Sequence, residues 1–83
     1  TSLQNISAYR NAAIISFQVD YGASYQIVLS PDGSLHEAAR NLFSALRQVD
    51  AFPVDVVLAE LVPNEGIGRA INDRLSRAAA AIV

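Results

Sequence analysis

Residues 54–81 constrain the fold most, because a hydrophobic run leads there through two glycines into an amphipathic pattern. The run at 54–62 is almost entirely apolar and has the length of a strand, which is typical of a strand inside a covered sheet. Gly66 and Gly68 then permit a tight turn. Beyond the turn, apolar residues at helical spacing predict a helix over 67–81 with one buried face, formed by Ile67, Ala70, Ile71, Leu75, Ala78, Ala79 and Ile82.

Two further strands are predicted upstream, at 12–19 and 24–30, because both segments are rich in Ile, Val, Phe and Tyr. Only residues 20–23 separate them, whereas a parallel pair normally needs a crossover of about a dozen residues. If the two strands are neighbours, we therefore expect an antiparallel hairpin. The polar residues 1–11 are interpreted as a linker or N-terminal extension, and residues 12–83 as one α/β domain.

A helix is predicted between the second and third strands. Ser34 and Glu37 have the spacing of a capping box, in which Ser34 accepts from the third helical N–H and Glu37 reaches back. An apolar stripe continues to Val49, and Pro53 prevents the helix from extending far beyond Asp50. The stripe consists of Leu35, Ala38, Ala39, Leu42, Phe43, Leu46 and Val49. The order strand-strand-helix-strand-helix predicts a small mixed α/β sheet with two helices packed on it.

Composition excludes several classes of function. The chain of 83 residues has six arginines, no lysine and no cysteine, which rules out a phosphate-loop lysine, a Schiff base and thiol chemistry. Its net charge of −2 argues against direct nucleic-acid binding. No apolar run approaches the ~20 residues that span a bilayer, so we expect no membrane segment. The apolar fraction of 52% leaves surface for a partner or a second copy.

The candidate site residues lie around the turn after the third strand. Glu60, near the carboxyl end of a buried strand, is expected either to face a site or to pair with an arginine. Gly66, Gly68 and Arg69 could bind a nucleotide or other anion at a helix N-terminus. The third glycine of a dinucleotide fingerprint is missing, so a simple tight turn is the alternative. Arg74, at the edge of the apolar stripe, is expected to reach a carboxylate, either Glu60 or one on a partner domain.

The remaining polar residues indicate surface positions. His36, the only histidine, stands in the first turn of a predicted helix without convergent partners, so we expect a solvated side chain and no metal site. Arg69, Asp73 and Arg77 follow one another at intervals of four and predict an exposed ion-pair ladder.

Three ordered motifs resemble the C-terminal domain of the two-domain L-threonylcarbamoyl-AMP synthases of the Sua type. The resemblance covers residues 34–81. A helix ends in an LR-x-x-D pattern, a strand ends in an acidic residue, and a G-I-G turn enters a helix containing Asp-Arg-Leu. The matching residues are Arg40-Asn41-Leu42-Phe43 with Leu46-Arg47 and Asp50, then Ala59-Glu60, then Gly66-Ile67-Gly68-Arg69-Ala70-Ile71 and Asp73-Arg74-Leu75.

This resemblance implies a Rossmann-like accessory domain that carries no catalytic residue and no cofactor of its own. It also implies a cytoplasmic parent enzyme, which joins threonine, bicarbonate and ATP into threonylcarbamoyl-AMP for the threonylcarbamoyladenosine modification of tRNA. The chemistry, and the ATP, would belong to an N-terminal YrdC-like catalytic domain, which would be this chain's partner. Arg74 would then be an interdomain contact.

Two other functions remain open from the sequence. The chain could be a stand-alone module that binds a nucleotide or anion at Gly66 and Gly68, or a dimerisation domain that forms a homo-oligomer. The chain starts at Thr1 rather than at a methionine, which suggests an expression boundary or a cut fragment. The sequence does not decide whether the chain is naturally separate, nor which ligand or surface it uses.

Overall fold

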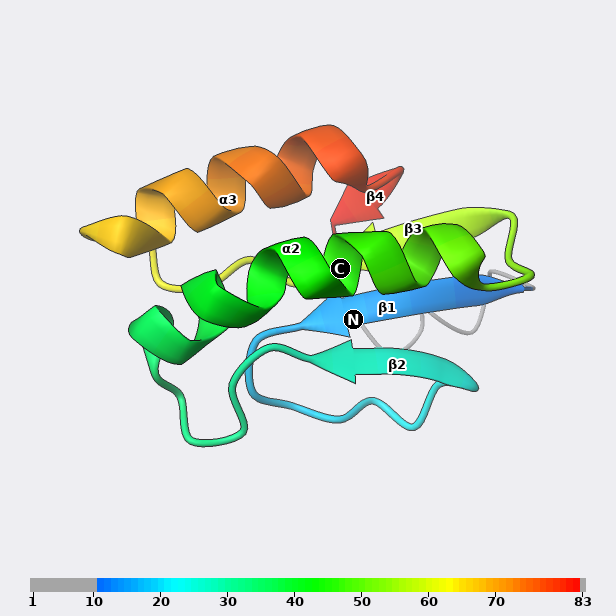
Figure 1. Ribbon diagram of the computed structural model, residues 1–83, viewed down its shortest axis with the longest axis horizontal. Helices are drawn as coiled ribbons and strands as arrows, with labels where there is room; N and C mark the ends of the chain where they lie inside the picture. Colours follow the sequence, from blue (N-terminus) through cyan, green and yellow to red (C-terminus); the bar gives the residue numbers. More distant parts are fainter. Residues whose placement is uncertain (1–10, 83) are drawn as a thin grey trace.

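Four strands and two helices make up the part of the chain that the computed structural model describes, residues 11–82 (Figure 1). The strand and helix order expected from the sequence is confirmed, with one short strand added at the end. The linker or extension predicted at 1–11 lies outside the described residues except for Asn11. The elements are β1 (Ala12–Ser16), β2 (Tyr25–Val28), α2 (Leu35–Ala51), β3 (Val56–Ala59), α3 (Ile67–Ala78) and β4 (Ala81–Ile82).

The sheet has the order β2-β1-β3-β4, so β3 is an internal strand between β1 and β4. Leu58 and Ala59 are completely buried in it, which confirms the covered strand expected from the apolar run. The paired segment is shorter than the predicted 54–62, since only Val56–Ala59 forms the ladder. Glu60 follows immediately after β3, at the carboxyl end of the sheet.

The predicted hairpin between the first two strands is wrong, because β1 and β2 are adjacent and parallel. Their register runs from Ala13 opposite Tyr25 to Ser16 opposite Val28. Since β1 ends at Ser16 rather than at residue 19, residues 17–24 are free to return along the sheet without a helix, as the cyan segment in Figure 1 shows. All pairings among the described residues are parallel, so the sheet is not mixed.

Helix α2 begins as the capping pattern predicted. Ser34 Oγ accepts a hydrogen bond from Glu37 N at 3.1 Å. The second half of the predicted capping box differs, because the Glu37 side chain does not reach the Ser34 amide directly. The Ser30 hydroxyl bridges them: it donates to Glu37 Oε1 at 2.6 Å and accepts from Ser34 N at 2.7 Å. The cap therefore also fixes the end of the segment that follows β2.

Both helices pack on the same face of the sheet and share one core. From the sheet it contains Ala13, Ile15 and Ala59, and from the helices Ala38, Leu42, Ala45, Val49, Ile71 and Leu75. The predicted stripes were broader than this buried face, since Phe43, Ile67, Ala70 and Ala78 are exposed. Within the described residues, neither helix is long and apolar enough to cross a membrane.

The predicted length of the last helix is also corrected. Helix α3 ends at Ala78, and Ala79 N donates to Leu75 O at 2.9 Å to close its final turn. The chain then becomes extended, and Ala81 and Ile82 pair with Leu58 and Ala59 as β4. The alanine run has high helix propensity, but a ladder with the internal strand outweighs it here.

Candidate functional site

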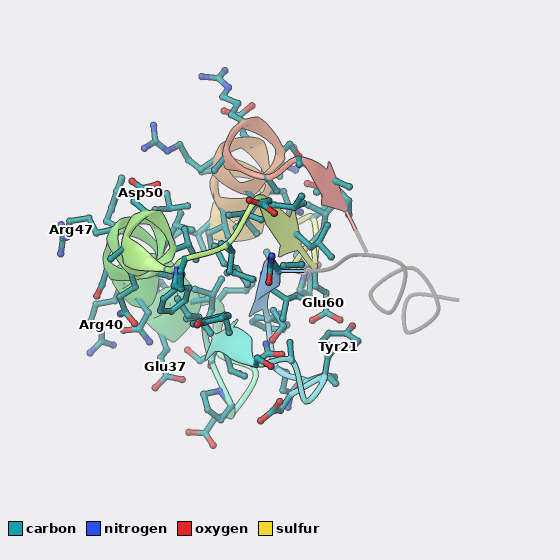
Figure 2. All side chains as sticks on the ribbon, turned by 90° about the vertical axis from the view of Figure 1, so that its right-hand side faces the viewer. Tyr21, Glu37, Arg40, Arg47, Asp50 and Glu60 are labelled. Atoms are coloured by element: carbon teal, nitrogen blue, oxygen red, sulfur yellow. The ribbon has the colours of Figure 1, made fainter. Side chains whose placement is uncertain are left out.

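Glu60 lies at the carboxyl end of β3 and is half-buried, on the side of the sheet that faces away from α2 (Figure 2). Its carboxylate holds the connection between β1 and β2. Oε1 accepts a hydrogen bond from Phe17 N at 3.0 Å, and Oε2 accepts one from the Tyr21 hydroxyl. The predicted pairing of Glu60 with an arginine is therefore wrong: its partners are a backbone amide and a phenol.

The contact with Glu60 changes the acidity of Tyr21. The hydrogen bond to the carboxylate, reinforced by desolvation and by the negative charge of Glu60, raises the pKa of Tyr21 to about 12. The phenol therefore keeps its proton at neutral pH and acts as a donor to Glu60. Such a pair is suited to holding a loop and poorly suited to removing a proton from a substrate.

Three more polar contacts secure the same loop. Gln26 Oε1 accepts from Tyr21 N at 3.1 Å, and Gln26 Nε2 donates to Ser16 Oγ at 2.8 Å. Ser16 Oγ in turn donates to Val19 O at 2.5 Å. Sequence reasoning missed Tyr21 and Gln26 as site residues. The available signals were a glutamine inside an apolar strand and a tyrosine beside the only connecting glycine.

The two glycines of the next turn have different structural roles. Gly66 precedes α3 with φ 55° and ψ −128°, a positive-φ conformation that side chains rarely adopt and that suits glycine. At Gly68, a Cβ atom would lie 2.0 Å from the carbonyl oxygen of Pro63, so the helix approaches the preceding loop too closely for any side chain. The tight turn expected from the sequence is thus accounted for by backbone geometry alone.

The amides of this turn are partly occupied by the chain itself. Gly68 N donates to Glu65 O at 2.9 Å and Arg69 N donates to Gly66 O at 3.2 Å. The N-cap residue of α3 is Gly66, which has no side chain to cap the helix, and the Arg69 side chain is exposed. The structure brings Gly66, Gly68 and Arg69 together at one helix end but keeps Glu60 on a separate network, and ligand binding at the turn stays a prediction.

Arg74 and the exposed charges of α3 complete the candidate set. The guanidinium carbon of Arg74 lies 5.3 Å from the centre of the Phe43 ring, so Arg74 stacks on α2 instead of reaching Glu60. Of the predicted ladder, only the Arg77 Nη2 to Asp73 Oδ2 pair forms among residues 11–82, at 3.3 Å. The predicted role of Arg74 as an interdomain contact is not tested by this geometry.

The described residues offer no grouping for metal binding. His36 is exposed on the first turn of α2, as expected. Within residues 11–82, no three His, Cys, Asp or Glu side chains converge in a way that could hold an ion. The buried polar side chains instead hydrogen-bond to the backbone or to one another, which is the arrangement of a structural scaffold.

Comparisons with known proteins all point to one family. Residues 2–80 match the family model described as "Threonylcarbamoyl-AMP synthase, C-terminal domain". The chain is 51% identical over 45 residues to a threonylcarbamoyl-AMP synthase of Pyrococcus abyssi, covering 54% of this chain and 13% of that protein. It is 39% identical over 59 residues to the Bacillus subtilis protein of the same name, covering 71% of this chain and 17% of that protein.

A third relative is the threonylcarbamoyl-AMP synthase of Schizosaccharomyces pombe, 47% identical over 47 residues, covering 57% of this chain and 12% of the relative. The chain thus spans between 12% and 17% of the length of these relatives. No solved structure matches it. The family match extends over nearly all of the chain and confirms the resemblance seen in its motifs: the chain belongs to the family of threonylcarbamoyl-AMP synthase C-terminal domains.

Proposed function

We propose that this chain is a non-catalytic accessory domain of a cytoplasmic threonylcarbamoyl-AMP synthase. The parent enzyme joins ATP, threonine and bicarbonate into threonylcarbamoyl-AMP and pyrophosphate, for threonylcarbamoyladenosine formation in tRNA. Its N-terminal YrdC-like domain binds ATP and performs the chemistry, while this chain docks on it. The observation that carries the proposal is the family match over residues 2–80, together with relatives whose names give the activity.

The polar contacts of the fold support an accessory role. Adenylate formation requires groups that bind a triphosphate and groups that orient an attacking carboxylate. Glu60 already accepts two hydrogen bonds, from Phe17 N and the Tyr21 hydroxyl. The amides of Gly68 and Arg69 donate within their own turn. In the described part of the chain these groups serve the fold, which leaves the chemistry to the catalytic domain.

A domain exchange in the Bacillus subtilis relative tests this proposal. Four proteins are compared: the relative, the relative without its matching segment, the relative with this chain in that place, and this chain alone. The readout is threonine-dependent release of pyrophosphate from ATP. We expect the chain alone to release no pyrophosphate. The deletion should lose activity, and the exchange should recover it.

The control is the same exchange carrying Gly68→Ala, which keeps the chain length but destabilises the folded domain, because the new Cβ would meet Pro63. It should recover less activity than the unaltered exchange. Pyrophosphate release by the chain alone would contradict the non-catalytic assignment. An exchange no more active than the deletion would contradict the accessory role.

A second candidate function is a small module that binds a nucleotide or another anion. It is favoured by the helix N-terminus at Gly66, which lacks a side-chain cap and has the exposed Arg69 beside it. Calorimetric titration of the chain with ATP, AMP and pyrophosphate tests it. Arg69→Ala is the suitable control variant, since replacing Gly68 would disturb the backbone. Saturable binding lost in Arg69→Ala supports the module, and sedimentation over a concentration series tests the dimerisation alternative.

A further inference from the structure

Phe43 is a large aromatic side chain placed on the solvent side of α2. It is 55% exposed, whereas the core face of the same helix is formed by Ala38, Leu42, Ala45 and Val49. The fold therefore does not need Phe43 for its core. An exposed aromatic ring costs hydration free energy unless it is covered in the working protein.

Three arginines surround this ring. Arg40 and Arg47 stand three residues before and four residues after Phe43 on the same helix, which makes them its neighbours on the helix surface. Figure 2 shows both arginines extending from α2 away from the sheet. Arg74 reaches over from α3, with its guanidinium carbon 5.3 Å from the ring centre. We call Arg40, Phe43, Arg47 and Arg74 the Phe43 patch.

The charge of the patch is opposite to that of the chain as a whole. It gathers three of the six arginines of a chain whose net charge is −2. Among residues 11–82 the only ion pair joins Arg77 and Asp73, so none of the three patch arginines is ion-paired. Glu37 and Asp50 stand at either end of the patch; Glu37 accepts a hydrogen bond from the hydroxyl of Ser30, and neither carboxylate is ion-paired with a patch arginine among the described residues. A cationic surface with an aromatic centre thus faces outward.

We infer that the Phe43 patch is the surface on which this domain docks against the remainder of its own synthase, and that the docking site there is acidic with an apolar centre. This inference rests on the proposed function. Aromatic residues and arginine are the residue types enriched at the energetically dominant centres of protein interfaces. Unpaired guanidinium groups select carboxylates, which they bind through two parallel hydrogen bonds.

The small size of the patch favours a partner on the same polypeptide. An interface between free proteins involves about 20–30 residues on each side. The patch offers only one aromatic residue and three arginines. A covalently linked partner needs much less, since the linker holds it at millimolar effective concentration. The chain spans only 12–17% of the length of its relatives, so in each relative the rest of the same protein can provide such a partner.

RNA is a weaker occupant by the same observations. Affinity for a phosphate backbone comes largely from the phosphates that Lys and Arg neutralise, and it grows with their number. The patch offers three positive charges on a chain of net charge −2. The aromatic ring could stack on a base, but Arg74 already covers part of it.

Thiol labelling of the full-length synthase tests the inference. Ser44 lies on α2 between Arg40 and Arg47, and the chain has no cysteine, so Ser44→Cys places a unique thiol of this domain at the patch. Ser76→Cys on α3 is the matched control. It is two positions from Arg74, and helical residues two apart point in nearly opposite directions. Maleimide incorporation at each position is measured by peptide mass spectrometry.

We expect Cys at position 44 to react slowly in the full-length protein, and on the order of tenfold faster when Phe43→Ala and Arg47→Glu are added. Position 76 should react at one rate in both backgrounds. Arg47→Lys, which keeps the charge, should retain most of the protection. Circular dichroism and the urea midpoint verify that each variant is folded, so that exposure of the thiol reports undocking.

Equal labelling of position 44 with and without the patch substitutions would overturn the inference. If the same protein still makes threonylcarbamoyl-AMP, the proposed function survives that failure. A full-length protein that releases no pyrophosphate with threonine, yet protects position 44, would contradict the proposed function instead. Protection that requires added tRNA, or that rises with protein concentration, would assign the patch to RNA or to a second copy and overturn the inference.

Discussion

The side chain of Asn72 pairs with both backbone groups of Val62. Its Oδ1 accepts from Val62 N at 2.8 Å, and its Nδ2 donates to Val62 O at 2.9 Å. An amide side chain thus does for Val62 what a neighbouring strand would do, just beyond the end of β3. Because Asn72 is only 7% exposed, these bonds attach α3 to the segment that follows β3 in a place largely shielded from water.

Asn72→Leu should therefore destabilise the fold strongly. Two hydrogen bonds are lost and both Val62 groups are left buried without partners, which predicts a loss of about 2–4 kcal/mol. Urea unfolding followed by circular dichroism measures it. Asn64→Ala is the control, since Asn64 makes only a 3.4 Å contact with Asn72, and it should stay within about 0.5 kcal/mol of the parent. Similar losses in both variants would mean that the pairing contributes little.

Gly68→Ala should destabilise the protein although alanine is the better helix former. The propensity gain is about 1 kcal/mol, but the new Cβ would lie 2.0 Å from Pro63 O, so the helix or the loop must shift. We expect a net loss of at least about 2 kcal/mol. Gly66→Ala meets nothing within 4 Å, so its cost of about 1–3 kcal/mol comes only from the backbone conformation, φ 55° with ψ −128°, which side chains rarely adopt. A Gly68→Ala protein as stable as the parent would contradict the close approach.

The Tyr21–Glu60 contact predicts an alkaline loss of stability. The pKa of Tyr21 is raised from 10.0 to about 12 in the folded protein, so the folded state holds the phenolic proton more tightly than the unfolded state. The stabilisation is therefore complete below pH ~10 and disappears as the pH rises through about 12. Because solvent screens this partly exposed contact, we expect a loss of no more than about 1 kcal/mol.

Ultraviolet titration of phenolate formation, combined with urea midpoints across that pH range, measures the effect. In Glu60→Gln the pKa of Tyr21 should fall back toward 10.0, since the negative acceptor is gone. Tyr21→Phe should abolish this part of the pH dependence. A pKa of Tyr21 that does not change when Glu60 is neutralised would refute the contact.

Ser34 should contribute a measurable share of the stability of α2. Its hydroxyl caps Glu37 N at 3.1 Å, and removal of such a cap costs about 1 kcal/mol. Ser34→Ala should show that loss in urea unfolding, and Ser34→Asp, which keeps an acceptor, should recover it. Ser44→Ala in the middle of the same helix serves as the comparison and should change stability by less than about 0.5 kcal/mol. Failure of aspartate to recover the loss would place the contribution of Ser34 elsewhere.

Helix α2 was predictable because its signals are local. The cap at Ser34, the apolar stripe and the stop at Pro53 all lie within one stretch, and the observed Leu35–Ala51 differs little from the predicted end near Asp50. The internal position of β3 was also predictable, since a strand that is apolar at every position has to be covered on both faces.

The direction of β2 was not predictable from the same kind of pattern. Phe17 and Val19 continue the apolar run of β1 but lie outside the ladder, which made the connecting segment look too short for a parallel return. Similarly, the alanines after Leu75 favour a helix by propensity, and only the free edge of β3 turns Ala81 and Ile82 into a strand. Both errors concern strand ends and partners, which depend on distant parts of the chain.

At the candidate site, sequence position predicted where Glu60 lies but not what it contacts. Its partner Tyr21 is 39 residues away and belongs to a loop whose path follows from the parallel return. Arg74 was correctly placed beside the apolar stripe, but its partner Phe43 was assigned to the core. A helical pattern predicts which face of a helix is buried. Which residues form the edge of that buried face depends on how the two helices pack against each other.

The carboxylate that follows β3 has a consequence for motion in the native state. Phe17 N and Tyr21 N lie outside every strand, yet each donates to a side chain anchored in the sheet. Their amide protons should exchange with deuterated solvent as slowly as those of a ladder, not at the rate of a surface loop. Release of this loop requires Glu60 to lose Phe17 N and the Tyr21 hydroxyl, and Gln26 to lose Tyr21 N, so residues 17–21 and the exit of β3 would open as a single cooperative unit.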